Sequence, residues 1–413
     1  MAARPIPAGP LPLRPSDLRG LYRLGVDGSV GLTDLVEAMH HTITSRIGFD
    51  RALPIGRSSG ITGAVYGVVR VGIKGAGHGV DAALRLVERT VRPQHATSPE
   101  RDAFVAALNG VCGDHLERSG NPLAIQMSMR VGGTALPLDR DALAQALPSA
   151  GRKLLVLLHG LCMNDRQWTR RGHDHGQALA QALGYTPVYL HYNSGRHVSQ
   201  NGREFAALLQ RLRLAWPVPL DELVILGHSM GGLVARSACH HAETQSLDWL
   251  PSLRALVCLG TPHHGAPLER GGRQIDQLLG LSSYVAPFAR LGKARSAGIT
   301  DLRYGNLQDA DWQGRDRHAQ RHDDRQPTPP PTGVAIYLLA ATTADAPGRL
   351  HHALIGDGLV PLASALGEHR NPALALPVPA EHRHVVPGCG HLDLLCHDEV
   401  LVQLQRWLGQ AAD

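Results

Sequence analysis

The sequence contains little of several features that mark particular classes of protein. Aromatic residues make up only 4% of its 413 residues, and lysine occurs at just three positions. The net charge of +5 is spread along the chain without a basic block, so no nucleic-acid partner is expected. The six cysteines include no Cys-x-x-Cys pair, and Cys239 and Cys258 fall in apolar segments, where cysteine usually packs as a small hydrophobe. We expect the thiols to be reduced.

Long apolar runs are scarce too. The least polar stretch, residues 58–69, ends at Arg70 after about a dozen residues, which is too short to cross a bilayer. Residues 1–20 are rich in proline and contain no continuous apolar segment, unlike a secretory signal. We therefore expect a cytoplasmic protein.

Histidine is abundant, with 24 copies, but its spacing matches no metal motif. The chain has neither zinc-finger spacing nor a His-Glu-x-x-His sequence, and a metal site needs ligands that converge with fixed geometry. We expect most histidines to be solvated, and we expect no metal and no cofactor.

The pattern of apolar residues divides the chain into three parts. Residues 1–20 form a proline-rich leader, residues 21–120 have the spacing of helices, and residues 121–413 alternate short apolar runs with helical patterns. Such alternation is typical of a parallel sheet in an α/β fold, whose strands are buried on both faces. A hairpin is expected around Gly132 and Gly133. Parallel strands are expected at 153–160, 186–193, 222–230, 253–262, 333–341 and 382–388.

The helical part contains a glycine-rich stretch at residues 60–91. Each glycine costs an isolated helix about 1 kcal/mol relative to alanine, unless another backbone packs closely against it. Two interpretations stay open: tight internal helix packing, or a surface that contacts a membrane or a second protein. Peripheral membrane contact through residues 21–120 is therefore one hypothesis, and no oligomeric state follows from the sequence.

Two segments match the pattern Gly-x-Ser-x-Gly, one around Ser229 and one around Ser58. Ser229 follows the apolar run 222–226 and precedes the helix-compatible stretch 233–242. This order of strand, sharp turn and helix is that of the nucleophile elbow of α/β-hydrolases. Ser58 has a proline close before it and no strand leading into it. Ser229 is therefore the predicted nucleophile.

A serine hydroxyl needs a general base, and the base needs an acid that orients it. In α/β-hydrolases the acid and then the histidine follow the serine along the chain. Asp357 lies between two glycines in a loop after the expected strand 333–341, and His391 lies just past the expected strand 382–388. We predict these two as acid and base. Weaker candidates are Asp345 and Asp393 for the acid, and His382, His384 and His397 for the base.

An oxyanion hole needs backbone N–H groups aimed at the charge that develops on the substrate. One donor is expected from Met230, directly after the nucleophile. The other is expected from the loop after the first long parallel strand, where Gly160 lets the chain turn. Leu161 is the predicted second donor, and Cys162 is the alternative.

Four motifs, taken together, resemble those of α/β-hydrolase lipases and esterases. They are GHSMGG (227–232), LGTPHHGAP (259–267), GDGLVP (356–361) and GHLDLL (390–395). The most similar groups are the PGAP1-like (GPI inositol-deacylase-like) and the bacterial triacylglycerol-lipase-like proteins. The resemblance covers about residues 121–408. It implies an α/β-hydrolase fold that cleaves carboxylic esters, with lipid-like substrates favoured.

Residues 263–332 interrupt the alternation of strands and helices. In an α/β-hydrolase, an insertion at this place can cover the site as a cap. One interpretation is that its apolar residues line an acyl pocket, and the other is that they pack on the sheet. The apolar residues are Ile275, Leu278, Leu279, Leu281, Val285 and Phe288.

Three classes of function are compatible with these residues. The favoured one is a hydrolase that cleaves a small-molecule or lipid ester through Ser229, Asp357 and His391 and an acyl-enzyme intermediate. An acyltransferase or thioesterase would use the same triad with a different acceptor or leaving group. A non-catalytic binding protein on this fold is the third class.

Overall fold

The computed structural model describes residues 14–29, 60–90, 98–266, 296–316, 323–344 and 356–410. The chain forms two compact units. The first comprises Met1–Arg101 and Leu116–Ala124, and the second comprises Asp102–His115 and Ile125–Asp413. The second unit contains the sheet and all the predicted site residues.

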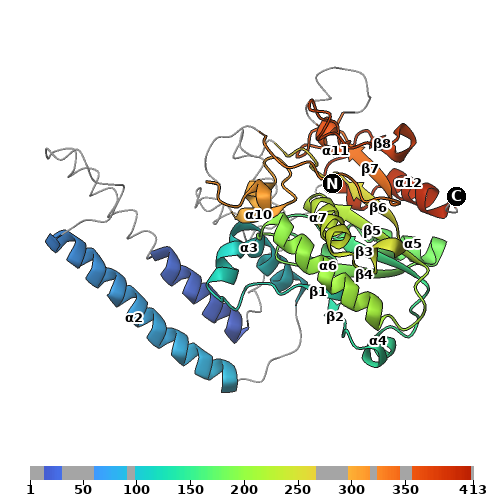
Figure 1. Cartoon of the computed structure of the whole chain (residues 1–413). Coiled ribbons are helices and arrows are strands. Elements are labelled where there is room, and N and C mark those ends of the chain that lie inside the picture. Colours follow the sequence, from blue (N-terminus) through green and yellow to red (C-terminus); the bar gives the residue numbers. More distant parts are fainter. Residues whose placement is uncertain are drawn as a thin grey trace, which may run out of the picture. The chain divides into compact units, whose positions relative to one another are not determined.

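One eight-stranded sheet forms the second unit, with the strand order β2-β1-β4-β3-β5-β6-β7-β8 (Figure 1). Its strands are β1 Ser128–Val131, β2 Thr134–Ala135, β3 Lys153–Leu158, β4 Thr186–His191, β5 Glu222–His228, β6 Leu253–Leu259, β7 Ala335–Ala341 and β8 Arg383–Val386. β1 pairs antiparallel with β2 and β4. The pairs from β4 through β8 are all parallel.

The structure confirms the parallel sheet that the apolar runs predict. The strands β3 to β7 are buried on both faces, as expected for a parallel sheet covered by helices. Most of the predicted runs extend past the carboxyl ends of the strands into the turns that follow them. The predicted hairpin is also present, with Gly132 and Gly133 at φ +58° and +79° in its turn.

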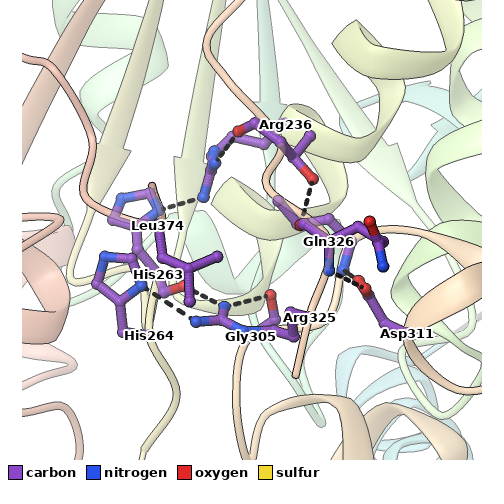
Figure 2. Close-up of a pocket in the computed structure, with 10 residues that line it drawn as sticks. Arg236, His263, His264, Gly305, Asp311, Arg325, Gln326 and Leu374 are labelled. Carbon is purple, nitrogen blue, oxygen red and sulfur yellow. Dashed lines mark hydrogen bonds between the residues drawn. The ribbon is translucent and has the colours of Figure 1, made fainter. Parts of the chain in front are cut away.

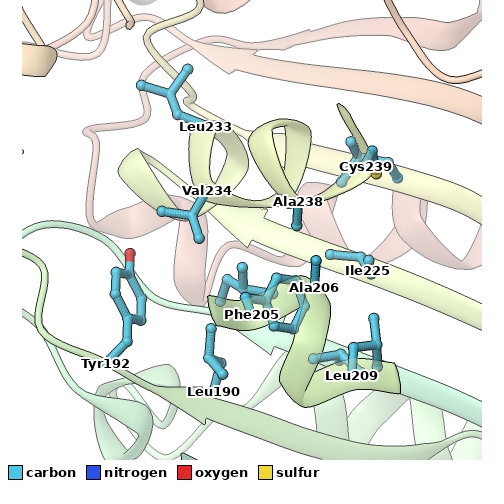
Figure 3. Packing of buried hydrophobic residues seen from close by; sticks show 14 of the residues in the cluster. Leu190, Tyr192, Phe205, Ala206, Leu209, Ile225, Leu233, Val234, Ala238 and Cys239 are labelled. Atoms are coloured by element: carbon cyan, nitrogen blue, oxygen red, sulfur yellow. The ribbon is translucent and has the colours of Figure 1, made fainter. Parts of the chain in front are cut away.

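Helices cover both faces of the sheet. α6 (Val198–Ala215) and α7 (Met230–Gln245) pack on one face, and α5 (His175–Leu183) and α12 (Asp398–Gly409) pack on the other. Figure 3 shows side chains of α6 and α7 meeting over the sheet, with Phe205 among them. Shorter helices are α4 Arg140–Ala146, η1 Asp165–Trp168, η2 Leu250–Ser252, α10 Ala297–Asp301, η3 Asp309–Asp311, α11 Leu362–Ala365, η4 Ala380–His382 and η5 Asp393–Leu395.

The order of the strands creates a switch point beside β3. From β3 the chain moves to β4 on one side and then returns to β5 on the other side of β3. The loops that follow β3 and β5 therefore lie next to each other at the carboxyl edge of the sheet. In open α/β sheets, ligands bind at this place.

The helix α3 (Pro99–Arg118) contributes residues to both units. Its backbone departs from helical geometry at Cys112, where φ is −139° and ψ is 22°. Within the second unit, Ala107 and Leu108 of α3 are at most 2% exposed. The domain boundary near residue 121 stays a prediction.

The first unit contains a helix at residues 15–29 and the long helix α2 (Gly60–Thr90). Asp17 receives two hydrogen bonds of 2.6 Å from the Arg101 guanidinium, and Asp81 pairs with Arg19 at 2.8 Å. Among the described residues, a Cβ atom on Gly67, Gly72, Gly75 or Gly79 of α2 would meet nothing within 4 Å. Tight internal packing, one of the two interpretations of the glycine-rich stretch, is therefore not found at these four positions. No helix within the described ranges is both long enough and apolar enough to span a bilayer.

A chain that begins at Pro99 should unfold at a higher temperature than one that begins at residue 121. The longer chain keeps Leu108, whose buried side chain alone stabilises the fold by about 1.5–3 kcal/mol. Thermal unfolding followed by circular dichroism measures the difference. Equal midpoints for the two chains would show that α3 adds nothing to the stability of the sheet unit.

Candidate active site

Ser229 occupies a sharp turn between β5 and α7. Its backbone has φ 54° and ψ −124°, a conformation that side-chain-bearing residues rarely adopt. The Ser229 N–H donates to the Leu259 carbonyl at 2.8 Å, which ties the turn to the neighbouring strand β6. Strain of this kind often occurs at functional sites, where the surrounding structure holds it in place.

The glycines on either side of Ser229 allow close backbone contacts. A Cβ atom on Gly227 would lie 2.5 Å from the Gly232 nitrogen, and one on Gly231 would overlap the Leu158 carbonyl oxygen. Both obstacles are backbone atoms, which cannot move aside as a flexible side chain can. The first turn of α7 can therefore lie against β5 and the end of β3 only if these residues are glycines.

Asp357 and His391 form a buried hydrogen-bonded pair. The His391 Nδ1 lies 2.6 Å from the Asp357 Oδ2, and the two side chains are 4% and 1% exposed. The other oxygen of Asp357 accepts the N–H groups of Leu359 and Val360, at 3.0 and 2.8 Å. Because Nδ1–H donates to the carboxylate, Nε2 of His391 is left as the acceptor that a general base needs.

His228 connects the elbow to the loop that carries His391. Its Nε2 donates to the His391 carbonyl at 3.0 Å, and the two rings lie 4.8 Å apart. Burial holds the pKa of His228 well below its usual value, so this ring is neutral. The structure thus brings His391 beside the turn of Ser229. No hydrogen bond joins the Ser229 hydroxyl to His391, although both residues are described, and such bonds are often long before a substrate binds.

The loop after β3 lies beside Ser229. A Cβ atom on Gly160 would be only 3.1 Å from the Ser229 Cβ. Within the described part of the chain, the N–H groups of Leu161 and Met230 donate to no acceptor. The N–H of Cys162 instead donates to the Ser194 Oγ at 3.0 Å. The two predicted oxyanion donors are thus available, whereas the alternative donor is already engaged.

A polar cavity of about 20 Å³ lies between α7 and the segment that follows β6 (Figure 2). Arg236 of α7 is buried there and donates to the Thr328 carbonyl at 2.7 Å and to the His263 Nδ1 at 3.3 Å. Burial lowers the pKa of Arg236 to about 10, so it remains cationic at neutral pH. No predicted triad residue lines this cavity. Its contacts tie the helix of the elbow to the described part of residues 263–332.

The weaker candidates for acid and base have other partners. Asp393 forms ion pairs with Arg170 and Arg171, at 3.9 and 3.1 Å. His384 lies 2.8 Å from Glu399. His397 caps the start of α12. Asp345, Ser58, and the apolar residues expected to line an acyl pocket (Ile275, Leu278, Leu279, Leu281, Val285 and Phe288) lie outside the described residues.

No sequence motif marks Ser194 or Arg236 as functional, and His228 stands out only as part of the motif around Ser229. The contacts of these three residues join segments that are far apart along the chain, so no local spacing predicts them. In the described ranges, no group of three or more histidine, cysteine, aspartate or glutamate residues is arranged to hold a metal ion.

The parallel sheet, its covering helices and the sharp turn between β5 and α7 define the α/β-hydrolase fold. The family model described as PGAP1-like alpha/beta domain matches residues 152–284. The match confirms the resemblance to the PGAP1-like group over this stretch, which runs from β3 through β6 and includes Ser229.

Several solved structures are similar to this chain. The lipase BlEst2 from Bacillus licheniformis, in its mature form, is 18% identical with a TM-score of 0.39, over 62% of this chain and 91% of that one. The esterase Pf2001 from Pyrococcus furiosus is 14% identical with a TM-score of 0.38, over 63% and 82% of the two chains. The lin2722 product from Listeria innocua is 14% identical with a TM-score of 0.37, over 64% and 96%. No curated protein matches the chain.

Gly231→Ala should destabilise the sheet unit by about 3 kcal/mol or more, because the added Cβ would overlap the backbone of β3. Gly409→Ala is the matched control. A Cβ there would meet Leu183 at an ordinary 3.5 Å, so little change is expected. Urea unfolding measures both variants. If the two variants were equally stable, the close contact between α7 and β3 would not be needed.

Proposed function

We propose that this chain is a serine hydrolase that cleaves carboxylic esters. The observation that carries the proposal is the buried Asp357–His391 pair, which lies beside the strained turn of Ser229. An imidazole oriented by a carboxylate and close to a serine is the arrangement that activates a hydroxyl nucleophile. The match to the PGAP1-like alpha/beta domain supports the same reaction class.

In the first step, the Ser229 Oγ attacks the carbonyl carbon of the ester while His391 Nε2 takes the hydroxyl proton. Asp357 holds the ring in place and stabilises its positive charge. The negative charge on the carbonyl oxygen is stabilised by the N–H groups of Leu161 and Met230. One such donor typically contributes about 10²–10³ to kcat. The alcohol then leaves with the proton from His391, and the acyl group stays on Ser229.

In the second step, a water molecule gives a proton to His391 Nε2 and attacks the acyl-enzyme. The same two N–H groups stabilise the second tetrahedral intermediate. When this intermediate collapses, the bond to the Ser229 Oγ breaks and His391 returns its proton to that oxygen. A carboxylic acid is released, and the enzyme regains its starting state.

The substrate is proposed to be a small-molecule or lipid ester with an apolar acyl group. This proposal is based on the apolar side chains in the insertion at residues 263–332, which would cover this edge of the sheet as a cap. Contact of the N-terminal helical part with a membrane surface, and a cytoplasmic location, stay hypotheses.

Ser229→Ala should abolish hydrolysis of p-nitrophenyl esters and labelling by a fluorophosphonate probe, because both reactions need the Ser229 oxygen. Ser58→Ala should keep both activities and is the matched control. The measurement is kcat/KM, together with the mass of the labelled peptide. Labelling of a different serine, or an active Ser229→Ala variant, would overturn the assignment of the nucleophile.

Medium-chain esters, roughly C4 to C10, should have a higher kcat/KM than acetate, since each methylene in an apolar pocket is worth about 1–3 kcal/mol. Polar replacement of Leu278 or Phe288 should flatten this preference more than it lowers acetate hydrolysis. A series of p-nitrophenyl esters measures the effect. An enzyme that prefers acetate, and whose preference those replacements do not change, would contradict the apolar pocket.

A further inference from the structure

The loop that carries Leu161 contains a strained turn. The Met163 N–H donates to the Gly160 carbonyl at 3.4 Å, which closes a four-residue turn. Cys162, at its third position, has φ 61°. Position three of a type II turn has a positive φ and usually holds glycine, because a Cβ atom disfavours this conformation. Something outside the turn must therefore hold Cys162 in place.

Ser194 provides one such anchor from the loop after β4. Its Oγ accepts the Cys162 N–H at 3.0 Å. Ser194 is 1% exposed and Cys162 is 5% exposed, so water cannot readily replace this bond. The bond fixes the peptide group between Leu161 and Cys162, which is the group that would rotate if the turn changed type.

The helix α3 packs against the same turn from another side. A Cβ atom on Gly110 would overlap the Cys162 Sγ and would lie 2.8 Å from the Cys162 Cα. The Gly110 carbonyl in turn accepts a 2.6 Å hydrogen bond from the Ser296 hydroxyl. Both residues of the Gly110–Cys162 contact belong to the sheet unit. The turn is therefore held between Ser194 and α3.

We propose that Ser194 is a positioning residue that directs the Leu161 N–H into the oxyanion hole by holding Cys162 in its left-handed conformation, with Gly110 of α3 packed closely against Cys162. This inference rests on the proposed esterase function. Neither residue touches the reacting atoms. Without the Ser194 acceptor, the Cys162 N–H would be buried and unsatisfied, and the strained turn would relax to another conformation. The Leu161 N–H belongs to the preceding peptide group of the same turn, so it would shift with the turn and lose the position from which it can reach the substrate oxygen.

The test compares Ser194→Ala with Ser199→Ala. Ser199 is also 1% exposed, and its hydroxyl donates to Asp309 at 2.6 Å, but it lies on α6 outside this turn. Ser194→Ala should lower kcat for p-nitrophenyl butyrate by about 10- to 100-fold with little change in KM, because full loss of an oxyanion donor costs about 10²–10³. Ser199→Ala should leave kcat unchanged. Equal kcat for the two variants would overturn the proposal.

Adding Cys162→Gly to Ser194→Ala distinguishes positioning from a general loss of stability. Glycine adopts a positive φ without strain, so the double variant should recover part of the lost kcat. A merely structural role for Ser194 predicts no recovery, because the glycine restores no hydrogen bond. A double variant no faster than Ser194→Ala would therefore count against the proposed role.

Hydrogen–deuterium exchange tests the anchor without any substrate. In Ser194→Ala, the amides of residues 160–163 should exchange at least about tenfold faster than in the wild type, whereas Ser199→Ala should leave them unchanged. Unchanged exchange in Ser194→Ala would show that the turn needs no anchor. A wild type that cleaves no ester would instead overturn the proposed function, while the exchange result would still decide whether Ser194 holds the turn.

Discussion

The geometry of this edge of the sheet depends on one backbone contact, between the first turn of α7 and the end of β3. At Gly231 the helix lies so close to β3 that a Cβ atom would overlap the Leu158 carbonyl. This contact brings the loop after β3 next to Ser229. It thereby places the Leu161 and Met230 N–H groups on adjacent loops, both without an acceptor in the described part of the chain. In that arrangement Ser229 has a positive φ, which is unfavourable for a residue with a side chain.

Much of the sheet could be predicted from the sequence, because strands buried on both faces must be continuously apolar. The run of leucine and valine in β3 shows this pattern directly. The membership of α3 was harder to predict. Residues 104–111 are all buried, but the sequence does not say against which core. Leu108 packs in the sheet unit, whereas Leu116, in the same helix, belongs to the other unit.

The pairing of Asp357 with His391 could be proposed from their positions after successive strands, since the carboxyl ends of parallel strands meet at one edge. The hydrogen bonds that hold the surrounding loops in place could not be proposed in this way. The bond from Cys162 to Ser194 joins two loops, and the bond from His228 to the His391 carbonyl joins an elbow to a distant turn. Such contacts depend on the folded backbone, and no sequence spacing encodes them. The histidines illustrate the same limit, because His159 and His263 are fully buried rather than solvated.

Burial also decides what these histidines do chemically. It lowers the pKa of His159 to about 3 and that of His228 well below its usual value. Neutral rings act as directional hydrogen-bond donors and acceptors, so near neutral pH these residues can orient the backbone without adding charge next to Ser229. His391 differs because its Nδ1 donates to the Asp357 carboxylate at 2.6 Å, which orients the ring and leaves Nε2 as an acceptor. The same residue type thus has two roles at one edge of the sheet, and a carboxylate partner distinguishes the predicted base from its neighbours.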